Sequence, residues 1–421
     1  MSVLRVALLR GSALFGVPVM IVLGIIAGQR GADSWSVDWF WATGQLQQHG
    51  VLLVPLTTAL AAWDASRNRR LGTALLYRTY PRSPLASALL DATGALLAGL
   101  AGWATTFLVM ALNVRGGGHP YWSVVLLGAF GFIPAALVGV VAGRYLPRYL
   151  APPVTAALVW LGLAFGSSST KDVVARLSTV DRQCCDVYTE PVPTTIAGQW
   201  LWLAAIGLAA VAVLSWPRLP HLVPGVLGSA AALATALVLI SSTGAQLTRP
   251  RPPQGEACRT EGEVTVCMWP EHAHDVDAWV AAAATFRARF ADLGQLPTLF
   301  IENGLRSPSS GAVSIGPVRA YQSPEDLVAS LAYSLVPPAP ECAAIGNGGY
   351  GFFPAATTRS LLNGWIRYRL QATAPSVSLV PPEDVPALDR LRALPADQQA
   401  QWYHAVVEAH RDCSTNPPRV P

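Results

Sequence analysis

Histidine and acidic side chains suited to metal binding or acid–base chemistry occur in the last third of the chain. They form two clusters: Glu271, His272, His274 and Asp275 in the segment WPEHAHD, then His404, Glu408 and His410. A zinc site on a helix commonly uses ligands four residues apart, because that spacing places both side chains on one face. His272 and His274 are two residues apart, and His404 and His410 are six apart. The spacing therefore favours surface or helix-capping roles over a metal site.

Motifs for nucleophilic catalysis and nucleotide binding are incomplete as well. The segment GAVSIG around Ser314 differs from G-x-S-x-G, the motif that exposes a catalytic serine on a sharp turn. The glycine-rich segment GNGGYG at residues 346–351 has no lysine and does not match G-x-x-x-x-G-K-[ST]. We therefore predict that this chain carries no ATPase, no metal and no cofactor, and that no residue set in it forms a convincing catalytic centre.

The composition indicates a membrane protein with a polar domain attached. Of the 421 residues, 52% are hydrophobic and 13% are charged, which excludes a purely cytosolic enzyme. The first 245 residues hold 15 basic and 8 acidic residues, and the remainder holds 14 basic and 17 acidic ones. Because the basic excess lies in the apolar part, it indicates membrane orientation and gives no support for nucleic-acid binding.

Seven apolar segments approach the length that a helix needs to cross a bilayer, which is about 20 residues. They are residues 11–29, 49–63, 92–114, 122–143, 151–166, 196–216 and 222–243. We therefore predict a polytopic α-helical membrane domain of about seven transmembrane helices at residues 1–245. A proline-rich linker at residues 246–255 follows, and then a mixed α/β domain at residues 256–421.

The distribution of arginine predicts the orientation of these spans. With the N-terminus inside, the inner segments carry ten arginines against one acid, Asp64, whereas the outer segments carry five basic and six acidic residues. This bias favours a cytoplasmic N-terminus in the plasma membrane, and seven crossings then place the C-terminal domain outside the cytoplasm. The first span could instead be a cleaved signal peptide, but its 19 uncharged residues are long for that role.

The six cysteines agree with this topology, because all of them fall on the predicted outer side, where disulfides persist. Cys258 and Cys267 flank a predicted hairpin turn at residues 260–263, so they could face each other as a disulfide. Cys342 and Cys413 are the remaining cysteines of the outer domain and its natural second pair. The neighbouring Cys184 and Cys185 strain to bond each other, so we expect them to pair elsewhere or with another chain.

The outer domain shows an alternation of predicted strands and helices. Two strands surround the hairpin turn, and a proline-initiated helix is expected at residues 270–293. Further strands are expected at residues 296–301 and 313–318, and further helices at residues 324–335, 355–371, 384–391 and 396–412.

The longest inner loop lies within residues 61–102 and contains a basic, weakly amphipathic stretch at residues 67–80. Leu71 and Leu75 are one helical turn apart, and Pro81 and Pro84 close the stretch. A short helix at the membrane surface fits this pattern. The alternative is a loop whose arginines only fix the topology and contact lipid headgroups.

This loop resembles the corresponding loop in the membrane subunits of actinobacterial ABC-2-type exporters, and the similarity extends over roughly the first 215 residues. The matching residues are Trp63, Asp64, Ala65, Arg67, Arg69, Arg70, Gly72, Leu75, Thr79, Pro81 and Arg82. The cytoplasmic N-terminus and the longer outer segment at residues 167–195 agree with that family. The seventh span and the outer domain depart from its unit of six spans with a cytoplasmic C-terminus.

The resemblance implies that the loop helix docks in a groove of a separate ABC ATPase subunit and transmits its closure. The inserted residues would be Leu71, Leu75 and Leu76, with Arg67, Arg69 and Arg70 pairing with acids at the groove rim. A second copy of the chain or another permease subunit would complete the translocation path, in contact with membrane lipid. The outer domain would then bind substrate or a partner.

Asp91, near the start of the third span, is a candidate intramembrane polar site, because carboxylates in membranes are commonly functional. It lies only seven residues after Pro84 and could instead sit at headgroup depth. Two other functions stay open on the sequence alone. The chain could be a membrane-anchored extracytoplasmic sensor or binding protein that does not transport, or an ectoenzyme of degenerate peptidase type.

Overall fold

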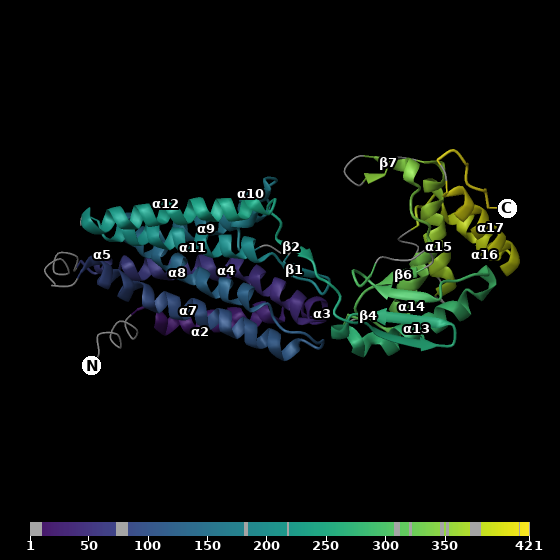
Figure 1. Ribbon diagram of the computed structural model, residues 1–421, viewed down its shortest axis with the longest axis horizontal. Helices are drawn as coiled ribbons and strands as arrows, with labels where there is room; N and C mark the ends of the chain where they lie inside the picture. Colours follow the sequence, from purple (N-terminus) through teal and green to yellow (C-terminus); the bar gives the residue numbers. More distant parts are fainter. Residues whose placement is uncertain are drawn as a thin grey trace. The chain divides into compact units, whose positions relative to one another are not determined.

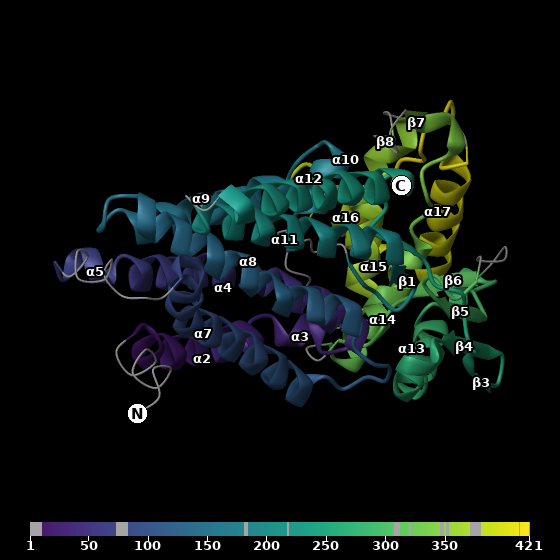
Figure 2. The same cartoon turned by 60° about the vertical axis from the view of Figure 1, so that its left-hand side comes forward.

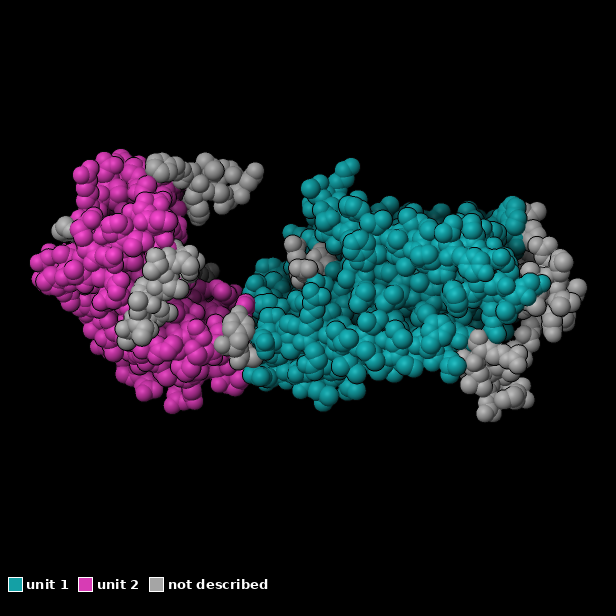
Figure 3. All heavy atoms as spheres, turned by 180° about the vertical axis from the view of Figure 1, so that it is seen from behind, with its two compact units in different colours: residues 1–252 teal, residues 253–421 magenta. Residues whose placement is uncertain are grey.

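The structure is a computed structural model of the whole chain. It describes residues 11–72, 83–180, 184–216, 219–306, 312–319, 322–345, 349–350, 353–370, 380–411 and 413–420. The chain divides into two compact units, Met1–Pro252 and Pro253–Pro421, which are coloured separately in Figure 3. Each unit is described by itself.

Unit 1 is a bundle of long helices that run alongside one another (Figures 1 and 2). Each predicted span corresponds to one helix: α2 (Ala13–Gln29), α4 (Trp39–Ala65), α7 (Pro84–Asn113), α8 (Trp122–Tyr145), α9 (Ala151–Ser167), α11 (Pro193–Leu214) and α12 (Leu219–Ser242). Three short helices complete the unit: α3 (Ala32–Trp35), α5 (Arg67–Arg70) and α10 (Asp172–Leu177). Figure 1 shows α5 at one end of the bundle, called the α5 end below, and α10 at the opposite end.

Four of these helices contain segments that are both long and apolar enough to cross a membrane: Leu85–Asn113, Trp122–Tyr145, Pro193–Leu214 and Leu222–Ser242. Helices α2 and α9 are apolar but have 17 residues each. The structure is thus compatible with a membrane location, and the seven-span topology stays a prediction.

Two helices start earlier than the hydropathy pattern predicted. Helix α4 begins ten residues before the expected span, because the Asp38 side chain accepts a hydrogen bond from the Trp41 amide at 2.7 Å and caps the helix there. Helix α7 begins at Pro84, where the Ser83 hydroxyl accepts a hydrogen bond from the Ala86 amide at 3.1 Å. Capping side chains, rather than the first apolar residue, determine where these helices begin.

Glycines allow the closest helix contacts of unit 1. Helix α4 packs against α2, α7, α8 and α9, and its contact with α8 includes Gly139 and Gly143. A Cβ atom on Gly139 would lie 2.3 Å from the Thr58 carbonyl oxygen, and one on Gly143 would lie 2.5 Å from the Ala62 carbonyl oxygen. Such G-x-x-x-G spacing lets two helix backbones approach closely. Helices α4 and α8 therefore form one tightly packed pair.

Part of the predicted linker belongs to unit 1. Strand β2 (Thr248–Pro250) pairs antiparallel with β1 (Thr189–Pro191). The next residue, Arg251, is buried, and its guanidinium donates to the Val187 carbonyl at 3.1 Å and lies 4.6 Å from the centre of the Phe40 ring. The expected free spacer at residues 246–255 is therefore shorter than predicted, because these backbone and side-chain contacts hold residues 248–251 against unit 1.

Unit 2 contains a four-stranded mixed sheet in the order β3 (Ala257–Glu261), β4 (Val264–Met268), β5 (Leu299–Glu302) and β6 (Ala312–Ile315). The β3–β4 pair is the predicted antiparallel hairpin, and β4, β5 and β6 are parallel neighbours. Helix α13 (Val276–Arg289) connects β4 to β5 and packs against β3 and β4 (Figure 1). The prediction of a mixed α/β domain is confirmed.

Further elements of unit 2 surround this sheet. They are α14 (Pro324–Ala332), α15 (Arg359–Leu370), α16 (Val385–Ala393), α17 (Ala396–Ala409) and the short pair β7 (Ala344–Ile345) and β8 (Gly349–Tyr350). The helix expected at residues 270–293 has 3-10 turns at both ends, Pro270–Asp275 and Ala291–Leu293. One hydrophobic core joins alternate residues of the strands, such as Val266 and Phe300, to Phe286, Trp365 and Val406 of the helices.

Candidate functional site

The inner loop predicted from the sequence is described only in its first part. Helix α5 comprises Arg67–Arg70 and follows α4 directly, so the predicted helix at residues 67–80 is four residues long where the structure describes it. Leu71 comes next and is 63% exposed. Leu75 and Leu76 lie outside the described residues. Of the three leucines predicted to insert into a partner, the structure therefore places one, and that one is exposed.

Arg69 connects the loop to a helix far along the chain. Its guanidinium donates hydrogen bonds to the Leu146 carbonyl at 2.7 Å and to the Gly143 carbonyl. The carbonyls of a helix's last turn have no intrahelical partners and carry partial negative charge, so an arginine binds well there. In the opposite direction, the Arg148 guanidinium donates to the Arg69 carbonyl at 3.3 Å. Arg69 thus ties α5 to the end of α8, which the resemblance did not imply.

Arg70 has a different position. Its guanidinium lies 3.4 Å from the centre of the Trp63 ring and donates to the Trp63 carbonyl at 2.9 Å. The Trp63 side chain is itself exposed, as is Leu71. Trp63, Arg70 and Leu71 therefore place an aromatic, a cationic and an aliphatic side chain near one another in the chain at the α5 end. We call these three residues the loop surface.

Two acidic residues hold helices together at the same end. The Asp64 carboxylate accepts from the Ser12 amide at 2.8 Å and from the Ser12 hydroxyl at 2.7 Å, which links the end of α4 to the start of α2. Asp91, the predicted intramembrane polar site, forms an ion pair with Arg144 at 3.3 Å, and Arg144 also donates to the Ser87 hydroxyl at 2.9 Å. Asp91 therefore joins α7 to α8 in this structure.

In unit 2, His272 and Glu302 form a buried pair at the carboxyl ends of β4 and β5. His272 Nδ1 lies 2.6 Å from Glu302 Oε1, and Oε2 of the same carboxylate accepts from the Trp269 amide at 2.9 Å. Both side chains are buried almost completely. Burial raises the pKa of the nearby Asp275 carboxyl, which accepts a hydrogen bond from the Val318 amide at 2.9 Å. These contacts hold the ends of the strands together and present no exposed catalytic group.

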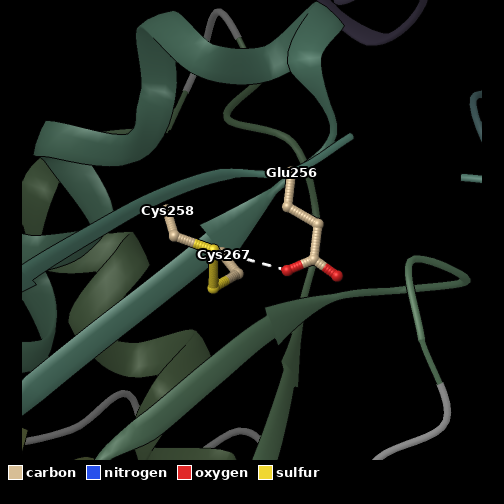
Figure 4. Close-up of side chains that lie close together, drawn as sticks. All are labelled: Glu256, Cys258 and Cys267. Atoms are coloured by element: carbon tan, nitrogen blue, oxygen red, sulfur yellow. Dashed lines mark hydrogen bonds between the residues drawn. A yellow bond between two sulfur atoms is a disulfide. The ribbon is translucent and has the colours of Figure 1, made fainter. Parts of the chain in front are cut away.

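One group of side chains in the described part of the chain has the spacing of metal ligands, namely Glu256, Cys258 and Cys267 (Figure 4). The two sulfur atoms are bonded as a disulfide, so neither is available as a thiolate. The Glu256 carboxylate forms an ion pair with Arg306 at 3.1 Å. These partners account for all three side chains without a metal ion. None of the histidines of the two sequence clusters belongs to such a group among the described residues.

The other cysteines also lie at bonding distance. Cys342 pairs with Cys413 across 71 residues, with their Cα atoms 6.2 Å apart, as the sequence analysis expected. Cys184 and Cys185 differ from the expectation, because the structure pairs them with each other. Cys185 has a φ of 76°, in the left-handed region, and this unusual backbone brings the two neighbouring sulfurs together.

Two further sequence candidates, Ser314 and His410, lie in unit 2. Ser314 lies on β6, and its hydroxyl donates to the Asn303 side-chain oxygen. His410 is buried, with Nδ1 2.9 Å from the Val406 carbonyl oxygen of its own helix turn. Gly346, Asn347 and Gly348 of the glycine-rich segment lie outside the described residues. Sequence reasoning missed the glycine pair of α8, which its G-x-x-x-G spacing could have revealed.

Residues 266–413 match a family model described as a domain of unknown function (DUF7224). The match covers about a third of the chain and lies entirely within unit 2. No curated protein and no solved structure matches the chain.

Proposed function

We propose that this protein is the membrane-spanning subunit of an ABC-type transporter of the exporter type, which works with a separate ATPase that docks on the loop surface. The observation that carries this proposal is the position of Arg69. It belongs to the loop that continues α4, and it binds the carbonyls at the end of α8. A force applied to the loop would therefore reach two helices of the bundle at once.

The packing between α4 and α8 supports such a transmission. Because Gly139 and Gly143 bring the two backbones into direct contact, the helices cannot slide past each other without a clash. The loop, α4 and α8 would then move as one body. A coupling element needs this property, because a flexible loop would absorb the closure of an ATPase instead of passing it on.

The chemistry of the loop surface suits a protein groove with an acidic rim. Leu71 offers an apolar side chain for insertion, and the Arg70 guanidinium above Trp63 offers a positive charge held in place. Under the topology predicted from the arginine bias, this surface faces the cytoplasm, where ATP is available. Unit 2 would lie outside, where its two cystine pairs would persist, and would bind substrate or a partner.

Co-purification of this chain with a candidate ABC ATPase subunit tests the proposal. Truncating an inserted leucine commonly costs about 2 kcal/mol at an interface, and an aspartate adds burial of an unpaired charge. We therefore expect Leu71→Asp to abolish recovery of the ATPase in detergent. The matched control is Leu150→Asp, because Leu150 is a leucine of similar exposure, 57%, at the start of α9. The control should retain the ATPase.

A second pair of variants separates docking from transmission. Arg69→Ala should leave the ATPase bound, since Arg69 faces α8 and not the loop surface, but should uncouple ATP hydrolysis from transport. Arg69→Lys should recover part of the coupling, because one ammonium can reach one of the two carbonyls. Equal ATPase recovery with wild type and Leu71→Asp, or none with either, would contradict the transporter proposal and favour the sensor.

The predicted orientation has its own test. A reporter that is active only outside the cytoplasm, fused after Pro421, should be active, because seven crossings place the C-terminus outside. Activity of a cytoplasmic reporter at that position would rule out the seven-span topology.

A further inference from the structure

The cystine Cys258–Cys267 of unit 2 lies outside the hydrophobic core. The two cysteines face each other directly in the register of β3 and β4. Val264, Val266 and Met268 of β4 belong to the core. Because successive side chains of a strand point to opposite faces, Cys267 points away from that core. The cystine therefore lies on the other face of the mixed sheet.

The two cysteines differ in exposure. Strand β3 is an outer strand of the sheet, and Cys258 on it is exposed, as are Glu256 and Thr260, the alternate residues on either side. Cys267 on the next strand is only 1% exposed. An external reagent can therefore approach this cystine from the Cys258 side and not from the Cys267 side.

Two side chains of opposite charge flank the cystine. The Arg306 guanidinium, through Nη2, lies 3.3 Å from Cys267 Sγ. Oε2 of Glu256 lies 3.5 Å from Cys258 Sγ, and Figure 4 shows this carboxylate beside the cystine. Glu256 and Arg306 also pair with each other at 3.1 Å, so each helps to hold the other in place. A guanidinium stabilises a neighbouring thiolate, whereas a carboxylate can accept a proton from a thiol.

We propose that Cys258–Cys267 is a redox-active cystine that exchanges with an external dithiol, with attack at Cys258 and with Cys267 as the leaving group. Thiol–disulfide exchange is faster when the leaving thiolate is stabilised, and Arg306 is placed to stabilise it here. The exposed sulfur receives the attack, and the buried sulfur next to the positive charge departs. The site belongs to unit 2 and does not depend on the ATPase proposal.

The exchange proceeds in two balanced steps. In the first, a substrate thiol gives its proton to the Glu256 carboxylate, its sulfur bonds to Cys258 Sγ, and Cys267 leaves as a thiolate beside Arg306. In the second, the other substrate thiol loses its proton to solvent and attacks the first substrate sulfur, and Cys258 leaves and takes the proton from Glu256. Two electrons pass from the dithiol, which becomes a disulfide, to the cystine, which becomes a thiol and a thiolate. The same steps in reverse reduce a disulfide.

Differential alkylation of the full chain in detergent tests this exchange. The oxidised protein is mixed with dithiothreitol, or with a reduced peptide that carries two cysteines, and mass spectrometry follows each cystine. We expect Cys258–Cys267 to open at least about tenfold faster than Cys342–Cys413, because the fold favours a cystine that closes a far longer loop more strongly. Each opened cystine should be matched by one peptide disulfide. Opening by dithiothreitol and not by the peptide would confine the substrate to small dithiols.

A monothiol and three variants test the direction of attack. Glutathione should remain as an adduct on Cys258, with Cys267 free. Arg306→Gln should slow the opening about threefold to tenfold, because a nearby opposite charge commonly changes an ionisation equilibrium by about tenfold or more and the leaving rate follows part of that change. Arg306→Lys should recover part of the rate. The matched control Arg259→Gln removes a positive charge next to Cys258 on the other side of β3, where Arg259 pairs with Asp277, and should open as wild type.

The following outcomes would overturn the proposal. Equal opening rates of the two cystines in the wild type would mean that Cys258–Cys267 is only a structural link. Glutathione bound to Cys267 would contradict the direction of attack. If Arg306→Gln opened at the wild-type rate, or slowed Cys258–Cys267 and Cys342–Cys413 equally, Arg306 would not be assisting the leaving thiolate.

Discussion

The two units of this protein differ in the partners that most of their described arginines bind, although unit 1 also contains the ion pairs Arg144–Asp91 and Arg249–Glu190. At the α5 end of unit 1, Arg69, Arg70 and Arg148 donate to the backbone carbonyls of Leu146, Trp63 and Arg69, respectively. Each of these carbonyls lies in or directly after the last turn of a helix. In unit 2, the arginines bind carboxylates, in the pairs Arg259–Asp277, Arg287–Glu263, Arg289–Glu325, Arg306–Glu256, Arg369–Asp292, Arg392–Asp389 and Arg411–Glu408. The difference follows the composition, because unit 1 has few acids and many helix ends whose carbonyls need donors.

The units also differ in the interactions that hold their folded chains together. In unit 1, glycines bring long helices into close contact, and its one cystine joins adjacent residues and encloses no loop. In unit 2, one cystine closes 71 residues and another joins two strands of a hairpin. Helix packing therefore holds unit 1, whereas covalent links and a compact core hold unit 2. Each prediction below tests one side of this contrast.

The largest effect is expected from removing the long cystine of unit 2. In the chain-entropy account, a loop of this length stabilises the folded state by about 4 kcal/mol, and the shorter hairpin loop by about 2.5 kcal/mol. The double variant Cys342→Ala/Cys413→Ala should therefore lower the urea midpoint of unit 2 more than Cys258→Ala/Cys267→Ala. Pulse proteolysis with mass spectrometry of unit 2 peptides measures both.

The matched variant in unit 1, Cys184→Ala/Cys185→Ala, should leave the stability of that unit nearly unchanged. Non-reducing peptide mapping of the wild type should first recover all three cross-links. Free thiols at Cys258, Cys267, Cys342 and Cys413 under oxidising conditions would contradict both the pairing and the extracytoplasmic placement of unit 2.

The next effect concerns the buried acid of unit 2. Glu302→Ala should cost about 3 kcal/mol, because it leaves the buried His272 ring and the Trp269 amide without this carboxylate. The same assay of unit 2 measures the loss. The control Glu325→Ala removes an exposed partner of Arg289 and should leave the midpoint within error of wild type. If Glu302→Ala and Glu325→Ala lowered the urea midpoint equally, burial would not determine how much these two carboxylates stabilise unit 2.

A smaller effect is expected from the helix contacts of unit 1. Gly139→Ala places a Cβ 2.3 Å from the Thr58 carbonyl oxygen, so α4 and α8 must separate, at a cost of about 2 kcal/mol. Gly162→Ala is the control, because no atom lies within 4 Å of its added Cβ and alanine favours the helix. Thermal unfolding in detergent should therefore show a lower midpoint for Gly139→Ala only. Equal midpoints would contradict the close contact.

The smallest effect is a pH dependence in unit 2. The hydrogen bonds from Arg369 lower the pKa of Asp292 below its ordinary value of 3.8. A lowered pKa in the folded state stabilises the protein above pH 3.8, and this contribution is lost as the pH falls through the folded-state value. Because the pair is partly exposed, we expect Asp292→Asn to cost less than about 1 kcal/mol at pH 7.

The difference between Asp292→Asn and wild type should then begin to shrink as the pH falls below 3.8 and disappear below the lowered folded-state pKa, where the Asp292 carboxyl is uncharged as well. Urea midpoints of unit 2 at pH 7, 5 and 3 test this convergence. A constant difference across this range would show that the ion pair does not set the stability of that contact.

Local patterns in the chain predicted the seven long helices of unit 1 and the strands of the mixed sheet, but not the short elements α3, α10, β1, β2, β7 and β8. Each of the seven apolar runs became a helix because an apolar run of that length satisfies its backbone within the helix. The Cys258–Cys267 hairpin followed from alternating residues around a short turn, and its register pairs the two cysteines directly. Cap residues shifted the starts of α4 and α7, since one side-chain hydrogen bond outweighs the hydropathy of the first turn.

Contacts between distant residues decided the roles of the charged side chains. Arg69 and Arg70 are adjacent and chemically identical, yet Arg69 binds carbonyls at the end of α8, 74 and 77 residues away, and Arg70 covers Trp63 in the last turn of α4. Asp91 forms its ion pair with Arg144, which lies 53 residues further along the chain. His272 likewise binds Glu302, 30 residues further along. Hydropathy and residue spacing describe only residues that are close along the chain. The partner of a charged side chain depends instead on which helix and strand ends lie side by side in the folded protein.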